Sequence, residues 1–195
     1  MSGPRPRPCS RNGRPKRASE MTGEGRRRRR VLSRTRIHER VRELGRQITA
    51  DYRDGQLVLL GVLNGAFVFC ADLCREIDLD VEIDFIRVAS YGGATESSGT
   101  ISLLREPSLD LVGKDLLLVE DIVDTGTTMA WLVDHFQRCA ARSVRICALI
   151  DKHERRRVAV RVDYAGFVLD QGFLVGYGLD CAERYRNLKA VYTLA

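Results

Sequence analysis

Long hydrophobic runs are missing from this chain of 195 residues. A helix that crosses a membrane needs about 20 consecutive apolar residues, and here charge or glycine interrupts every strong apolar run. We therefore predict no membrane span. The amino-terminal end lacks the apolar segment of a secretory signal, and its proline-rich stretch from Arg5 to Pro15 is a poor amphipathic helix for a transit peptide.

Paired cysteine motifs are also absent. The six cysteines form no Cys-x-x-Cys pair, and most of them lie inside apolar patterns. Cys70 and Cys74 are four residues apart on a predicted helix, but no nearby histidine or second pair completes a metal site. Buried free thiols in a reducing compartment fit best, so we expect a cytoplasmic protein. Walker-type loops, dinucleotide-binding glycine patterns and zinc-protease helices are missing too.

Acidic residues are scarce in the first 30 residues, which determines how the net charge of +6 is distributed. Residues 1–30 hold eleven Arg or Lys and two Glu, a net charge of +9, so residues 31–195 carry −3. The segment is rich in Arg, Gly, Pro and Ser and ends in five arginines. Because it has almost nothing to bury, we predict a disordered tail at 1–30 and one domain of ordinary size at 31–195.

Several interpretations of the tail stay open. Clustered arginines favour binding to nucleic acid or another acidic surface, because the bound phosphates release counterions. Interleaved aromatic side chains for base stacking are missing, so a solvated extension is the simpler interpretation. We expect no nucleic-acid partner for the rest of the chain. Met21 is an alternative start that would shorten the tail.

Strands and helices alternate along the rest of the chain. Spacings of three and four among apolar residues predict a helix from Thr35 to about Tyr52. Apolar runs and periodicity then predict strands at 57–63, 81–88, 116–119 and 144–150, helices at 66–77 and 127–139, and short β pieces at 158–162, 165–169 and 173–177. This alternation favours an α/β fold with a central parallel sheet that helices cover on both faces.

Polar residues follow four of the predicted strands. They are Asn64-Gly65, Ser90-Tyr91, Glu120 to Thr128 and Asp151-Lys152. Ligands of parallel sheets bind beyond the carboxyl ends of the strands, so we expect the four segments to meet at one rim and form one site.

The segment from Leu116 to Met129 carries the densest chemistry. An apolar run, typical of a strand buried on both faces, ends at adjacent carboxylates, and a hydroxyl-rich turn then opens a helix. Free N–H groups and the positive end of the helix dipole at such a turn suit phosphate. The carboxylates suit ribose hydroxyls, a divalent cation or a proton transfer. A buried strand with an acidic turn is the plainer alternative.

Within this segment, Val119 to Thr128 (VEDIVDTGTT) resembles the phosphoribosyl-pyrophosphate (PRPP) motif of type I phosphoribosyltransferases. That motif is shared by enzymes acting on different bases and by some non-catalytic regulators. The resemblance implies the type I phosphoribosyltransferase fold, a central parallel sheet flanked by helices with a small hood subdomain. The residues implied to bind PRPP are Glu120, Asp121, Asp124, Thr125, Gly126, Thr127 and Thr128.

Further segments resemble the 6-oxopurine phosphoribosyltransferases, the hypoxanthine-guanine branch. Gly61 to Gly65 is similar to the pyrophosphate loop, which implies a non-proline cis peptide bond before Asn64. The stretch from Asp84 to Gly92 resembles the strand and mobile lid that exclude water from the reaction. From the residues alone, an Asn-Gly turn and a flexible hairpin loop stay open. The residues implied to bind pyrophosphate are Asn64, Gly65, Arg87 and Arg186, with Ser90 and Tyr91 in the lid.

The purine side of the resemblance rests on Asp151-Lys152 and on Phe173 to Asp180. Lysine donates and cannot accept a hydrogen bond, which favours the 6-oxo group over the amino group of adenine. Phe173 is implied to stack on the purine, and backbone groups at Leu174 to read the ring edge. From the residues alone, Lys152 is also readable as a solvated lysine and Phe173 as a core aromatic.

The resemblance also implies which residues bind the purine and which bind Mg²⁺. The purine-binding set is Lys152, Phe173, Leu174 and Asp180, and the Mg²⁺ ligands are Glu120, Asp121 and Asp180. The neighbouring Arg155 to Arg157 we interpret as surface charge.

The resemblance spans Ile37 to Leu188 and implies a reaction. The phosphoribosyl group of PRPP would be transferred to N9 of hypoxanthine or guanine, forming IMP or GMP and pyrophosphate in purine salvage. Asp124 would be the catalytic residue, beside purine N7, and Mg²⁺ the cofactor. A homodimer or homotetramer is expected. Two alternatives stay open: a regulatory nucleic-acid binder that keeps the fold, and the same chemistry on another base, xanthine above all.

Overall fold

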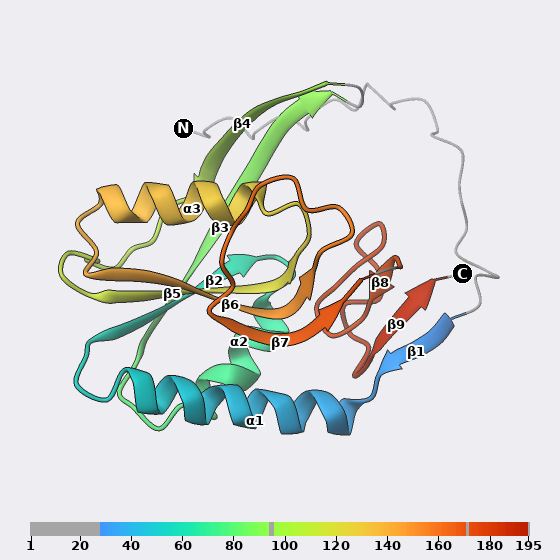
Figure 1. The fold of residues 1–195 in the computed structure, drawn as a ribbon, viewed down its shortest axis with the longest axis horizontal. Coiled ribbons are helices and arrows are strands. Elements are labelled where there is room, and N and C mark those ends of the chain that lie inside the picture. Colours follow the sequence, from blue (N-terminus) through green and yellow to red (C-terminus); the bar gives the residue numbers. More distant parts are fainter. Residues whose placement is uncertain (1–27, 94–95, 171, 195) are drawn as a thin grey trace, which may run out of the picture.

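The computed structural model describes residues 28–93, 96–170 and 172–194. In these ranges the strands form a six-stranded sheet, in the order β4-β3-β2-β5-β6-β7, and a three-stranded sheet, in the order β1-β9-β8 (Figure 1). The elements in chain order are β1 (Arg28–Leu32), α1 (Arg34–Asp51), β2 (Leu57–Leu63), α2 (Phe67–Cys74), β3 (Glu82–Gly93), β4 (Glu96–Arg105), β5 (Asp115–Val123), α3 (Thr127–Arg138), β6 (Ser143–Lys152), β7 (Tyr164–Leu169), β8 (Leu174–Val175) and β9 (Val191–Leu194).

The six-stranded sheet confirms the predicted α/β fold. Its strands run parallel from β3 through β2, β5 and β6 to β7, and only β4 pairs antiparallel at the edge. Helices α1 and α2 cover one face, and α3 covers the other (Figure 1). Strand β5 lies between β2 and β6, so its first residues are buried on both faces, as the unbroken apolar run predicts.

Two hydrophobic clusters hold these layers together. Because successive side chains of a strand point to opposite faces, β2 and β5 contribute to both clusters. Leu59 and Leu117 pack on the α1 and α2 side, whereas Leu60 and Leu118 pack on the α3 side. The strands that carry the site are therefore anchored from both faces.

The three-stranded sheet joins segments from opposite ends of the chain. Its strands pair antiparallel, β1 with β9 and β9 with β8, and it corresponds to the predicted hood (Figure 1). The predicted tail boundary is wrong by three residues, because Arg28 to Arg30 pair with β9 and Leu32 is buried. Backbone pairing needs no apolar side chains, so composition could not reveal this strand. The prediction for residues 1–27 lies outside the described residues.

Two other expectations about strands need correction. The stretch after Tyr91, expected to be a loop, belongs to a hairpin in which β3 continues to Gly93 and β4 begins at Glu96. Residues 158–162 form no strand. Their chain instead turns against the start of α3, where the N–H of Val158 donates to the carbonyl of Thr125 at 3.1 Å.

The helices and the cysteines of the described ranges bear on two further predictions, the membrane span and the state of the thiols. None of the helices in the described ranges combines the length and the apolar character that a membrane crossing needs. The cysteines of these ranges (Cys70, Cys74, Cys139, Cys147 and Cys181) are free. Burial raises the pKa of the Cys70 thiol to about 12, so this thiol stays protonated at neutral pH.

The contact between α1 and the turn after α2 yields a stability prediction. A Cβ at Gly45, in the buried face of α1, would overlap the backbone carbonyl of Glu76. We expect Gly45→Ala to lower the free energy of unfolding by about 1–3 kcal/mol, although alanine favours a helix over glycine by about 1 kcal/mol. Urea denaturation measures the change. Arg46→Ala, on the exposed face, is the control, and a stabilised Gly45→Ala variant would contradict the packing argument.

Candidate active site

Two adjoining cavities lie at the rim where the carboxyl ends of β5 and β6 meet the loop after β2. The larger one, of about 400 Å³, also touches the segment around β8. The smaller one, of about 170 Å³, lies over the turn that opens α3. Ile122 and Asp124 line both cavities. Predicted site residues in the larger cavity are Asn64, Gly65, Asp121, Asp124, Lys152, Phe173, Leu174, Asp180 and Arg186, and those in the smaller one are Glu120, Asp124, Thr125, Gly126 and Thr128.

The smaller cavity has the features of an anion site. Its floor is the turn from Asp124 to Thr128, within which α3 begins at Thr127 without a side-chain cap and without an acidic residue in its first turn. The first N–H groups of a helix lack partners within the helix, and the helix dipole is positive there. Gly126 has a φ of 81°, and a Cβ at this position would overlap the carbonyl of Val158. This turn therefore requires glycine. The N–H of Thr127 donates weakly to the Thr125 hydroxyl at 3.4 Å, and the N–H groups of the turn are placed to meet an anion.

The two adjacent carboxylates of β5 do not share a cavity. Glu120 lines the smaller cavity and Asp121 the larger, as expected for successive side chains on a strand. Burial, followed by the charge of Asp121, raises the pKa of the Glu120 carboxyl well above its usual range. Burial likewise raises the pKa of Asp121. Both carboxylates would be stabilised by a cation or by ligand hydroxyls.

The predicted Mg²⁺ ligands are only partly brought together. Asp121 and Asp180 both line the larger cavity, whereas Glu120 does not. Within the described ranges, no group of three or more Asp, Glu, His or Cys side chains is placed to hold a metal ion. Asp180 is also paired with Arg186 at 2.9 Å. These oxygens fit Mg²⁺ only if substrate oxygens and water complete the shell, which is a common arrangement for this ion.

The loop after β2 approaches its neighbours too closely for side chains. The peptide bond between Leu63 and Asn64 is cis, as the resemblance implies. A Cβ at Gly65 would overlap the carboxylate of Asp121, and one at Gly178 would overlap the carbonyl of Gly65. The loop after β2 therefore lies against the side chain of Asp121 on β5 and against the backbone of the chain after β8.

The larger cavity is also lined by Lys152, Phe173 and Leu174, which are implied to bind the purine. Phe173 is 55% exposed, so it is a cavity wall and not the core aromatic that stayed open from sequence. Lys152 is only 6% exposed, and its Nζ lies 3.0 Å from Glu154 Oε2. The hydroxyl of Tyr177 donates to Asp72 on α2 at 2.6 Å. This bond ties the segment that carries Phe173 to the main domain.

Some predicted residues do not reach either cavity. Arg87 is exposed on β3 and lines neither one, and the side chain of Thr127 is likewise outside both linings. Ser90 and Tyr91 belong to the hairpin of β3 and β4, which extends beyond the edge of the sheet (Figure 1). The side chains of this part of the hairpin lie outside what the structure describes.

Asp124 differs from the other carboxylates of the site. Its Oδ1 atom is buried and has no hydrogen-bond partner among the described residues, and its Oδ2 lies 3.5 Å from Arg155. An unpaired buried acceptor costs about 1–3 kcal/mol. Such an atom at the junction of two cavities is suited to meet a ligand's proton or hydrogen-bond donor.

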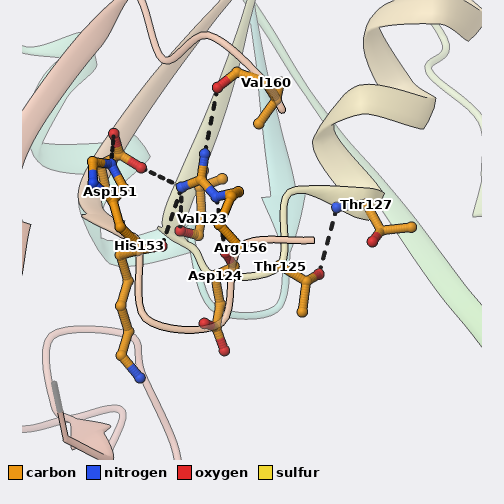
Figure 2. A network of polar contacts seen from close by, with 9 residues as sticks. Val123, Asp124, Thr125, Thr127, Asp151, His153, Arg156 and Val160 are labelled. Atoms are coloured by element: carbon orange, nitrogen blue, oxygen red, sulfur yellow. Dashed lines mark hydrogen bonds and ion pairs between the residues drawn. The ribbon is translucent and has the colours of Figure 1, made fainter. Parts of the chain in front are cut away.

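Sequence reasoning missed one of the arginines that follow Lys152. The interpretation as surface charge is wrong for Arg156, whose side chain is 18% exposed. It holds for Arg155, whose side chain is 63% exposed although it also borders the larger cavity. Figure 2 shows the guanidinium of Arg156 among backbone carbonyls of the site. Three consecutive arginines look alike in sequence, and only the turn of the backbone decides which of them points inward.

Comparisons with known proteins agree with this geometry. The model of the phosphoribosyl transferase domain family matches residues 30–182. The chain is 42% identical to a hypoxanthine-guanine phosphoribosyltransferase of Bacillus subtilis, over 84% of this chain and 91% of that protein. It is 45% identical to a bifunctional TilS/HprT protein of Listeria innocua, over 81% of this chain, but it spans only 24% of that longer protein. A solved hypoxanthine phosphoribosyltransferase from Staphylococcus aureus matches with a TM-score of 0.83 and 38% identity, over 86% of this chain and 91% of that one.

The contact between Gly65 and Asp121 yields a prediction for ligand binding. Gly65→Ala should displace the carboxylate of Asp121 or shift the loop, and so weaken binding of PRPP, the ligand implied by the motif, by about tenfold or more. Calorimetric titration measures the affinity. In an Asp121→Ala background the overlap is gone, so Gly65→Ala should add little further loss. Full affinity of the single variant would refute the contact argument.

Proposed function

Because the chain belongs to the phosphoribosyl transferase domain family, we propose that it transfers the phosphoribosyl group of PRPP to N9 of hypoxanthine or guanine. The products are IMP or GMP and pyrophosphate. This transfer is a reaction of purine salvage. The observation that best supports this proposal is the position of Asp124. It lies where the turn suited to an anion meets the cavity that Lys152 and Phe173 line. One molecule with a phosphate at one end and a purine at the other fits this arrangement.

The turn from Asp124 to Thr128 binds the 5′-phosphate in this proposal. Its backbone N–H groups, with those of the first turn of α3, donate to the phosphate oxygens. The hydroxyls of Thr125 and Thr128 border the same cavity. Glu120, beside them, meets the ribose hydroxyls.

Pyrophosphate occupies the larger cavity, near the loop after β2. Backbone N–H groups at Asn64 and Gly65 donate to it, and Arg186 supplies positive charge. Asp121 and Asp180 would hold Mg²⁺, which neutralises the charge of the leaving pyrophosphate when it is bound. Arg87 has no role in this arrangement unless closure of the β3–β4 hairpin moves it.

The purine lies against Phe173 in the outer part of the larger cavity. Lys152 donates to the 6-oxo group, and the backbone at Leu174 faces the ring edge. The ammonium of Lys152 is paired with Glu154 and offers no acceptor, so a 6-amino group facing it gains no hydrogen bond and is disfavoured. The same argument does not separate hypoxanthine from guanine or xanthine, which all carry a 6-oxo group.

Positioning supplies most of the catalysis. Bond breaking at C1′ of the ribose leaves positive charge on the sugar. The larger cavity holds base and pyrophosphate on either side of C1′, while the smaller one holds the 5′-phosphate. Asp124, next to purine N7, carries the proton that the base exchanges during the reaction. The β3–β4 hairpin with Ser90 and Tyr91 closes over the site and keeps water from capturing the sugar.

Asp124→Asn is the direct test of the acid/base role. The amide keeps the size of the side chain but cannot take up a proton, so we expect kcat to fall by about 10²- to 10⁴-fold. The fold and PRPP affinity should be retained. Asp134→Asn, the same change on the exposed face of α3, serves as the control. Wild-type turnover by Asp124→Asn would refute the role.

A panel of bases tests the reaction itself. Pyrophosphate release is measured with PRPP and Mg²⁺ and with hypoxanthine, guanine, xanthine, adenine or uracil in turn. We expect turnover on hypoxanthine or guanine and none on adenine or uracil. Turnover on xanthine alone would move the proposal to that base. No turnover on any base, with PRPP still bound, would favour a regulatory binder, whose affinity for nucleic acid would fall with salt and on removal of residues 1–27.

A cytoplasmic location and a homodimer or homotetramer are parts of the same proposal. Free thiols in the described ranges support the first. Light scattering of the purified protein determines the second.

A further inference from the structure

We propose that Arg156 is a positioning residue that holds the 5′-phosphate turn and the end of β6 together. These contacts keep Asp124, on the turn, and Lys152, at the end of β6, at a fixed distance from each other. The inference rests on the proposed function for its kinetic consequence, but the contacts that carry it do not depend on that function.

The guanidinium of Arg156 reaches both elements at once (Figure 2). On the side of the turn, Nε donates to the carbonyl of Asp124 at 3.0 Å and Nη2 donates to that of Val123 at 3.0 Å. On the side of β6, Nη2 donates to the Asp151 carboxylate and to the carbonyl of Lys152 at 3.2 Å. One planar group therefore joins the residue that carries the proton to the strand end that carries the purine-binding lysine.

The contacts of Arg156 are largely shielded from water, which strengthens them. The side chain of Arg156 is 18% exposed and that of Asp151 is 13% exposed. The second oxygen of Asp151 lies 3.0 Å from Nε2 of His153, so this carboxylate is held from both sides. A charge pair of this kind, shielded from water and joined to backbone carbonyls, is far stronger than a pair on the surface.

The backbone around Arg156 reinforces the same junction. The N–H groups of Arg157 and Val158 both donate to the carbonyl of Thr125, at 2.9 and 3.1 Å. The Cδ of Arg156 lies close to the position that a Cβ on Gly126 would occupy. The loop after β6 is therefore packed against the phosphate turn over several residues, and Arg156 is its only side chain described as bonded to that turn's carbonyls.

The geometry requires arginine and not simply a positive charge. Five acceptors surround the group, the fifth being the carbonyl of Val160 at 3.4 Å from Nη1. The two N–H groups of Nη2 are shared among three of these acceptors, and Nε and Nη1 each face one other. Arginine spreads its donors over a rigid plane, whereas lysine offers three from one atom. A lysine at this position can keep the pair with Asp151 but cannot also reach the carbonyls of Val123 and Asp124.

The consequence for the reaction follows from distance. Asp124 and Lys152 act on two edges of one purine, so loosening the junction lets them move relative to the ring. A misplacement of about 1 Å in an active site costs about a hundredfold in rate. Arg156 itself lines neither cavity, so its effect is exerted through the lining residues that it holds.

The test compares Arg156 with its exposed neighbour Arg157. R156M should lower kcat by about a hundredfold and raise KM for PRPP, and R156K should recover only a small part of that loss. R157M and R157K, which make the same charge changes, should behave as wild type. Full recovery in R156K would overturn the proposal, because charge alone would then suffice. Unchanged kcat and KM in R156M would also overturn it.

Hydrogen exchange separates positioning from general destabilisation. In R156M and R156K, amides of residues 121–130 should exchange faster, while those of β2 and α1 keep their rates. Uniform acceleration over the whole chain would mean a structural role only and would overturn the proposal. R156K serves if R156M fails to fold. If the wild type turns over no base, the proposed function fails. A comparison of local exchange between the Arg156 and Arg157 variants then still tests whether Arg156 holds the phosphate turn and the end of β6 together.

Discussion

The position of β5 between two parallel neighbours is the constraint on which the site depends. Its residues up to Val119 are buried on both faces, and its register is set by pairing with β2 on one side and β6 on the other. A slip of one residue would turn the whole apolar set outward, so the register is strongly specified. Because the register is specified, Asp121 can lie against Gly65 and the turn after β5 can lie beside the end of β6.

Close backbone approach is the second feature that shapes the site. Gly65, Gly126 and Gly178 each stand where a Cβ would overlap a neighbouring group. Backbone at these points brings N–H groups within reach of phosphates without side chains between them. The hood sheet then covers the rim, and the bond between Tyr177 and Asp72 keeps its purine-facing segment on the main domain.

Local patterns in the sequence could predict the central elements. The apolar run 57–63 has the same bounds as β2, and the helix expected from Thr35 to Tyr52 differs from α1 by one residue at each end. The cis peptide bond before Asn64 followed from the resemblance. Strands that depend on long-range backbone pairing, such as β1 and β9, leave no periodic pattern and were missed.

Side-chain direction was harder to predict than position in the chain. Glu120 and Asp121 line different cavities because side chains alternate along the strand, and their shared role at the ribose and Mg²⁺ stays a prediction. The inward turn of Arg156 depends on five acceptors from three separate stretches of the chain, which no local pattern encodes. Arg87 was assigned by its place in a motif, and its exposed position shows that motif position alone does not place a side chain.

In the proposed function the two cavities are the two ends of one substrate site. A crystal structure of the protein with IMP bound tests this most directly. We expect the 5′-phosphate on the N–H groups of the turn from Asp124 to Thr128, the purine against Phe173, and the 6-oxo group within hydrogen-bond distance of Lys152. A nucleotide bound elsewhere, or with its phosphate in the larger cavity and its base at the turn, would contradict it.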